Sequence, residues 1–245
     1  MRLCLGTLTV LPVRPPEAVD RRTAGGAMVL APLAGLLLGL AAALVALLPL
    51  PPLVIGLLAV GVLAVGSRAL HLDGLADTAD GLGSRRPAAG ALEVMRRSDI
   101  GPFGVVALVF AIGLQAASAA STLDRPGGAA ALVVAVMAAR TVLPLLCHRL
   151  PAARPEGLGQ MVAGTVGTTS ALLSLGLAAV LCAGVLLADP AYGVVRCALA
   201  AVVGVLAGLG FAAHCVRRFG GLTGDVLGAG VETALTAALL VLAPD

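Results

Sequence analysis

Residues 169–188 read "TSALLSLGLAAVLCAGVLLA", twenty consecutive residues without a charged side chain. A helix of about 20 apolar residues is long enough to cross the hydrocarbon core of a bilayer, which is about 30 Å thick. The whole chain has the same character, because 59% of its 245 residues are hydrophobic and only 12% are charged. A soluble domain would carry about twice that fraction of charged residues. The composition therefore indicates an integral membrane protein.

Seven apolar segments follow one another along the chain and predict an all-α polytopic membrane protein. Their approximate limits are 27–48, 53–70, 102–121, 129–147, 169–188, 192–214 and 226–243. Glycines interrupt several of them, which membrane helices tolerate and use for close helix contacts. The first segment lacks a convincing small-residue cleavage site, so we expect a retained span rather than a signal peptide. We expect a single integral membrane domain over residues 1–245.

The sixteen basic residues are all arginines, and their distribution predicts the orientation in the membrane. One set of connections comprises the N-terminal tail, 71–101, 148–168 and 215–225. When each arginine within a span is counted with the connection nearest to it, this set holds every arginine except Arg125 and Arg196. The positive-inside rule places this set in the cytoplasm. We therefore expect a protein of the cell (inner) membrane whose active site faces the cytoplasm.

The stretch "HLDGLADTADGL", residues 71–82, places three carboxylates beside the second apolar segment. Asp73, Asp77 and Asp80 are spaced i, i+4 and i+7, which puts them on one face of a helix. Like charges at this spacing are destabilising unless something neutralises them. Oxygen ligands favour Mg²⁺ or Mn²⁺ over zinc, which prefers His and Cys. We predict that these three residues bind Mg²⁺ at a substrate diphosphate; the alternative is a solvated helix face.

Asp80 is predicted to be catalytic as well as a metal ligand. His71 lies near the carboxylates, and a histidine at a helix boundary is more often a hydrogen-bonded cap.

A second motif, "RRFGGLTGDVLGAGVE" at residues 217–232, combines two arginines with a glycine-rich turn. Successive backbone N–H groups in such a turn can bind phosphate oxygens. Asp225, at the mouth of the last span, is a predicted catalytic residue. Alternatively, the turn only caps the final helix. Glu232, inside the span, is either a functional group or a packing hydrogen-bond partner. The predicted substrate-binding residues of this motif are Gly220, Gly221, Thr223 and Gly224.

A third motif, "EVMRRSDIGPFG" at residues 93–104, precedes the helix that Pro102 is expected to begin. Arg96, Arg97 and Ser98 are predicted to bind phosphate groups of the substrate. The alternative for the arginines is anchoring at the membrane surface.

Together with "LTVLPVRPP" (8–16), "APLAGLLLGL" (31–40) and "RPEGLGQ" (154–160), these motifs resemble the cobalamin synthase family, the adenosylcobinamide-GDP ribazoletransferases. The resemblance covers nearly the whole chain in order. It implies a Mg²⁺-dependent transferase of late cobalamin biosynthesis that joins adenosylcobinamide-GDP to α-ribazole or its 5′-phosphate and releases GMP. The sequence departs from the family pattern at Arg97 and Asp99, where the family has an acidic residue before the serine and a basic one after it.

Two other functions remain open at this stage. Membrane prenyltransferases and CDP-alcohol phosphotransferases also use Asp-rich helices to hold Mg²⁺ and a diphosphate, and a cation transporter would use the same carboxylates as its path. The expected partners are small-molecule substrates and the lipid bilayer, with an oligomer possible. A net charge of +3 is too small to suggest a nucleic-acid partner.

The arginine distribution generates a test of topology. Reporter fusions after residues 49 and 245 should report outside the cell, and a fusion after residue 155 should report inside, because the positive-inside rule fixes the side of each connection. A C-terminus on the cytoplasmic side would contradict this orientation.

Overall fold

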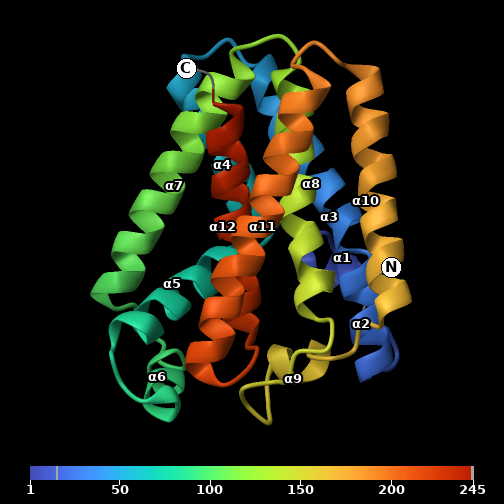
Figure 1. The fold of residues 1–245 in the computed structure, drawn as a ribbon. Helices are drawn as coiled ribbons and strands as arrows, with labels where there is room; N and C mark the ends of the chain where they lie inside the picture. Colours follow the sequence, from blue (N-terminus) through green and yellow to red (C-terminus); the bar gives the residue numbers. More distant parts are fainter. Residues whose placement is uncertain (15, 244–245) are drawn as a thin grey trace.

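The computed structural model describes residues 1–14 and 16–243, and within these ranges every regular element is a helix (Figure 1). A single parallel bridge joins Ala152 and Leu222. The elements are α1 (Arg2–Leu8), α2 (Arg21–Val29), α3 (Ala31–Ala43), the 3₁₀ helix η1 (Leu44–Leu47), α4 (Pro52–Gly66), α5 (Leu70–Gly83), α6 (Ala88–Val94), α7 (Pro102–Leu123), α8 (Gly128–Leu146), α9 (Leu158–Val162), α10 (Thr168–Ala188), α11 (Val194–Phe219) and α12 (Gly224–Leu242).

The predicted fold class, an all-α polytopic membrane protein, is confirmed. Five of the described helices, namely α7, α8, α10, α11 and α12, are long and apolar enough to cross a membrane. Two bent pairs, α2 with α3–η1 and α4 with α5, bring the possible total to seven. The first of these begins at Arg21 rather than at residue 27, because Asp20 accepts a hydrogen bond from the Thr23 backbone N–H and forms a capping box.

Helix α8 lies at the centre of the bundle, where it packs against α3, α10, α11 and α12. Almost all of its side chains are buried. By contrast, α10 and α11 carry large hydrophobic side chains that are more than half exposed, such as Leu173 and Leu206. Exposed apolar surface of this kind is what a lipid-facing helix presents, so the apolar residues fill the core and also coat the bundle.

Small residues allow α11 and α12 to approach closely. A Cβ added to Gly208 would lie 2.5 Å from the Gly230 carbonyl oxygen, and one added to Gly204 would lie 2.7 Å from the Ala234 oxygen. These two glycines are four residues apart, as in the small-xxx-small pattern of membrane helix pairs. The position of α12, which carries the last motif, thus depends on this contact.

A sharp turn between α4 and α5 redirects the chain by 91°. Arg68 and Ala69 both adopt left-handed backbone conformations there, with φ near 55°. The Arg68 guanidinium also donates a hydrogen bond to the Gly6 carbonyl, which ties the turn to α1. As a result, α5 runs across the bundle rather than along it (Figure 1).

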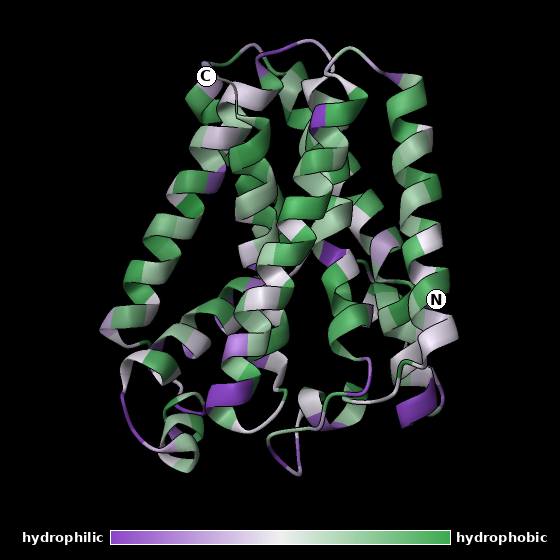
Figure 2. Ribbon diagram, in the orientation of Figure 1, coloured by the Kyte–Doolittle hydropathy of each residue, from purple (hydrophilic) through white to green (hydrophobic). Residues whose placement is uncertain are grey.

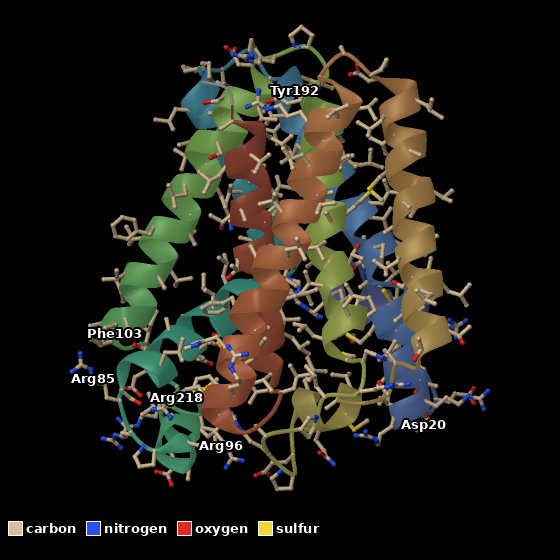
Figure 3. All side chains as sticks on the ribbon, in the orientation of Figure 1. Asp20, Arg85, Arg96, Phe103, Tyr192 and Arg218 are labelled. Atoms are coloured by element: carbon tan, nitrogen blue, oxygen red, sulfur yellow. The ribbon has the colours of Figure 1, made fainter. Side chains whose placement is uncertain are left out.

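Polar residues gather at the end of the bundle where α5 lies. Figure 2 shows the hydrophilic residues concentrated there, below the apolar bodies of the helices. Asp20, Arg96 and Arg218 lie at this end, whereas Tyr192 lies at the opposite end (Figure 3). Helix α12 also ends at the opposite end (Figure 1). The three sequence motifs, far apart in the chain, therefore meet at one end of the bundle.

The α11–α12 contact predicts the effect of overpacking. Replacing Gly208 with Leu should destabilise the protein by about 1–3 kcal/mol, because the new side chain meets the α12 backbone. Gly210→Leu is the matched control, since a Cβ at Gly210 has no atom within 4 Å. Thermal unfolding of the purified protein in detergent measures both, and equal melting temperatures would contradict the packing described.

Candidate functional site

Helices α5 and α12 cross in backbone contact at the polar end. A Cβ on Gly74 would lie 2.7 Å from the Asp225 carbonyl oxygen, and one on Gly228 would lie 3.0 Å from His71 Cα. Glycine is therefore required on both sides of the crossing. This contact brings Asp225, at the start of α12, beside the part of α5 that carries the three predicted metal ligands.

A pocket of about 180 Å³ opens beside this crossing. The start of α5 contributes Asp73 to its wall, and the turn before α12 contributes Thr223, Gly224 and Asp225. The connection between α8 and α9 forms the opposite wall with Arg154, Glu156 and Gly157, and the start of α9 adds Gly159. The pocket is thus built from three segments that are distant in the sequence.

Arg154 is the cation of this pocket. Its Nη2 donates a hydrogen bond to Asp225 Oδ2 at 3.0 Å, and both side chains are mostly buried, at 16% and 24% exposed. Its Nε is buried and has no hydrogen-bond partner among the described residues. Of the five N–H groups of the guanidinium, only one on Nη2 donates a hydrogen bond within the described residues, so the pocket lining carries a cation with donors not used by Asp225.

Asp77, one turn beyond Asp73, is surrounded by like charges. It lies on α5, outside the helices that run along the bundle. Burial, reinforced by the carboxylates of Asp225, Asp73 and Asp80, raises the pKa of Asp77 to about 7. Arg154 acts in the opposite direction but does not compensate. The cluster thus has an excess of negative charge that a cation would relieve.

Asp80 is directed away from the pocket. It is buried, and its carboxylate accepts hydrogen bonds from the backbone N–H of Gly101 at 2.7 Å and of Gly104 at 3.0 Å. Gly101 is the N-cap of α7 and Gly104 is its third residue, so Asp80 caps that helix and interacts favourably with its dipole. The structure therefore gives Asp80 a role that the sequence did not predict.

The three aspartates do not converge on one point. Among the described residues, no three His, Cys, Asp or Glu side chains lie close enough to hold a metal ion by themselves. The expected clamp of Asp73, Asp77 and Asp80 is therefore not preformed, because Asp80 is bound to the α7 backbone. Asp73 is exposed and Asp77 is half-buried, and neither carboxylate accepts a hydrogen bond within the described part of the chain. Their role as metal ligands stays a prediction.

The glycine-rich turn before α12 is used mainly for packing. Gly220 ends α11 in a left-handed conformation, with φ of 83°. A Cβ on Gly221 would lie 2.5 Å from the Ala153 backbone nitrogen, and one on Gly224 would lie 3.2 Å from Leu158 Cβ. Thr223 is the N-cap of α12, and its hydroxyl accepts a hydrogen bond from Val226 N–H at 3.1 Å. Their predicted contacts with substrate remain untested.

The third motif lies at the surface near the pocket. Arg96 forms an exposed ion pair with Glu156, one of the pocket residues. Arg97 and Ser98 are exposed beside it. The structure thus connects Arg96 to the site through Glu156, whereas Arg97 and Ser98 lie on the open surface. Phosphate binding by Arg96, Arg97 and Ser98 stays a prediction.

His71 does not cap a helix as expected. It is 2% exposed, and neither ring nitrogen has a hydrogen-bond partner among the described residues. Its backbone instead packs against Gly228.

Sequence reasoning missed Arg154 as a site residue. The stretch 154–160 was used only for the family resemblance, although an arginine and a glutamate in a long connection between two spans were a usable signal. Its place opposite Asp225 depends on the bridge between Ala152 and Leu222, which no local pattern indicates.

The fold and the site define a polytopic helical membrane protein with an acidic pocket at one end of its bundle. The family model described as cobalamin-5-phosphate synthase matches residues 1–243. A relative from Nocardioides sp., named adenosylcobinamide-GDP ribazoletransferase, is 49% identical over 99% of this chain and 97% of its own length. Relatives with the same name from Frankia casuarinae and Bradyrhizobium diazoefficiens are 44% and 38% identical over 99% of this chain, covering 93% and 92% of their own lengths.

The chain belongs to the cobalamin-5-phosphate synthase family. No solved structure matches it.

Because Asp80 accepts two hydrogen bonds from α7, we expect its substitution to lower the stability of the protein and not only its activity. Asp80→Asn should destabilise the protein by about 1–2 kcal/mol, because an amide cannot accept from both α7 N–H groups. Asp77→Asn, on the same helix, should leave the melting temperature close to that of the wild type. Unchanged stability of the Asp80 variant would argue against its capping role.

Proposed function

We propose that this chain is a Mg²⁺-dependent adenosylcobinamide-GDP ribazoletransferase. It would join adenosylcobinamide-GDP to α-ribazole or its 5′-phosphate and release GMP. The names of its relatives and the family match over residues 1–243 support this activity over a CDP-alcohol phosphotransferase, a prenyltransferase or a cation transporter. The observation that carries the proposal is the pocket in which Asp73, Asp225 and Arg154 face one another.

The residues around the pocket fit Mg²⁺. This ion is usually held by one or two carboxylates together with substrate phosphates, rather than by a complete protein cage. Asp73 and Asp77, with Asp225 across the crossing, supply hard oxygen ligands, and their mutual repulsion favours a cation. Bound Mg²⁺ would neutralise the negative charge of the diphosphate during transfer. A preformed three-carboxylate site is not needed for this.

The protein's own groups would position the reacting phosphates. The pocket, at about 180 Å³, is smaller than the roughly 300–1,000 Å³ of sites that enclose a whole drug-sized ligand. It therefore suits the diphosphate, with the corrinoid and the guanosine outside it. The guanidinium of Arg154, which lines the pocket, would bind a phosphate oxygen. A ribazole hydroxyl would attack the phosphorus on the cobinamide side and lose its proton, with GMP as the leaving group.

The location of this chemistry follows from the charge distribution. The pocket lies at the arginine-rich end of the bundle, which the positive-inside rule assigns to the cytoplasm. Water-soluble substrates would then reach it without crossing the inner membrane.

Turnover of variants tests the proposal. With purified protein, GMP release from the GDP-activated corrinoid should fall about 10²-fold or more in Asp77→Asn and Arg154→Gln, because the first removes a carboxylate ligand of Mg²⁺ and the second removes a positive charge at the phosphates. Arg149→Gln is the matched control, since Arg149 lies in the same connection but bonds the Thr168 hydroxyl away from the pocket. It should retain wild-type activity.

Chelation completes the test. EDTA should abolish GMP release, and Mg²⁺ added in excess should restore it. Wild-type activity in both site variants would exclude this pocket, and a wild-type protein that releases no GMP would exclude the function.

A further inference from the structure

Two polar side chains lie buried where α7 faces α12, inside the apolar bundle. Gln115 of α7 is 1% exposed, and Glu232 of α12 is 5% exposed. A polar or ionisable group inside a membrane helix is costly unless it is hydrogen-bonded. The sequence left open whether Glu232 is a functional group or a packing partner, and the transfer reaction proposed above uses neither side chain.

One amide group joins the two helices. Gln115 Nε2 donates to Glu232 Oε2 at 2.8 Å and to the Thr236 hydroxyl at 3.0 Å. Thr236 in turn donates to the Glu232 carbonyl, four residues earlier in α12. An amide nitrogen has two N–H donors, and here each has its own acceptor. Gln115 therefore holds two successive turns of α12 at once.

Apolar packing between α7 and α12 is incomplete beside these hydrogen bonds. A pocket of about 270 Å³ lies between the two helices, and its lining includes Ala107 and Ala111 of α7 and Glu232, Thr236 and Leu240 of α12. An unfilled space forfeits the van der Waals contacts that side chains would make there. The hydrogen bonds of Gln115 thus carry a larger share of the contact between α7 and α12.

This contact closes a ring of three helices at the candidate site. Asp80 of α5 accepts hydrogen bonds at the start of α7, and Gly74 of α5 meets the Asp225 backbone of α12. Gln115 supplies the third link, between α7 and α12. Asp225 and Glu232 are seven residues apart on one uninterrupted helix, which puts them on the same face about 10 Å apart. A rotation or axial shift of α12 that displaces Glu232 therefore displaces Asp225 as well.

We propose that Gln115 is a positioning residue, which holds Glu232 and Thr236 and so fixes the rotation and depth at which α12 presents Asp225 to the aspartates of α5. In this role Glu232 acts as a hydrogen-bond acceptor and not through its charge. Neither side chain touches the substrate. The inference rests on the proposed function of the pocket, because the position of Asp225 affects turnover only if the transfer occurs there.

Two variants separate the hydrogen bond from the charge. Gln115→Leu removes both hydrogen bonds at similar side-chain size. It should lower kcat for GMP release, by up to about 10²-fold for a displacement near 1 Å, with little change in KM. Glu232→Gln is the conservative variant, because its amide oxygen can still accept from Gln115, and it should keep kcat within about threefold of wild type.

Two threonines of α12 provide a matched pair. Both hydroxyls are partly buried, but the Thr236 hydroxyl accepts from Gln115, whereas the Thr233 hydroxyl donates only to the Ala229 carbonyl of its own helix. Thr236→Val removes one of the two links between the helices and should lower kcat about threefold. Thr233→Val should leave kcat unchanged.

Backbone hydrogen exchange over residues 224–232 gives a readout that does not depend on activity. It should be faster in Gln115→Leu and equal to wild type in Glu232→Gln, while exchange over the buried helix α8 stays unchanged in both. If the wild type releases no GMP, the proposed function fails, and this measurement still decides whether Gln115 holds α12.

Three results would overturn the inference. A Glu232→Gln variant as inactive as Gln115→Leu would mean that the charge of Glu232 is needed. Wild-type kcat in Gln115→Leu together with a lower melting temperature would mean a purely structural contact. Unchanged exchange over residues 224–232 in Gln115→Leu would mean that α12 does not depend on this link. If Gln115→Leu does not fold, the threonine pair decides: a lower kcat in Thr236→Val alone supports the inference, and equal kcat values overturn it.

Discussion

The contact between the backbones of α5 and α12 is the constraint on which the site depends. Gly74 and Gly228 leave no room for a side chain between the two helices. This crossing places the carboxylates of α5 beside Asp225, although the two segments are about 150 residues apart in the chain. The α11–α12 glycine contacts and the bridge between Ala152 and Leu222 then fix the other walls of the pocket around this crossing.

The negative charge at this crossing is partly compensated by an arginine and by backbone N–H groups. Arg154 bonds Asp225, and the α7 N-terminus binds Asp80 through two backbone N–H groups. Burial, together with the like charges around it, raises the pKa of Asp77, which has no such partner. The protein's own groups thus compensate the charges of Asp225 and Asp80. The carboxylates of Asp73 and Asp77 remain available to a cation and a phosphorylated substrate.

The sequence was sufficient for the fold class and for the side of the bundle on which the motifs lie, because apolar segment length and arginine placement are local properties. It also predicted the helical stripe of Asp73 and Asp77. It did not predict that Asp80 would cap α7, or that Arg154 would face Asp225. Both are contacts between segments distant in sequence, and a spacing pattern within one helix carries no information about them. Arg140 was assigned to a span end, whereas its side chain is buried in the core.

The short length of α4 has a consequence for the surroundings of the site. Its 15 residues span about 22 Å, whereas the 26 residues of α11 span about 39 Å. A hydrocarbon core about 30 Å thick is longer than α4 alone, so a bilayer around the bundle would have its boundary near the 91° turn and α5. A helix shorter than the hydrocarbon core is met by local thinning of the bilayer, by snorkelling of flanking side chains or by oligomerisation. Where the bilayer thins, the acidic cluster would lie below the general level of the membrane surface, in a layer less polar than bulk water, where each charge acts more strongly on its neighbours.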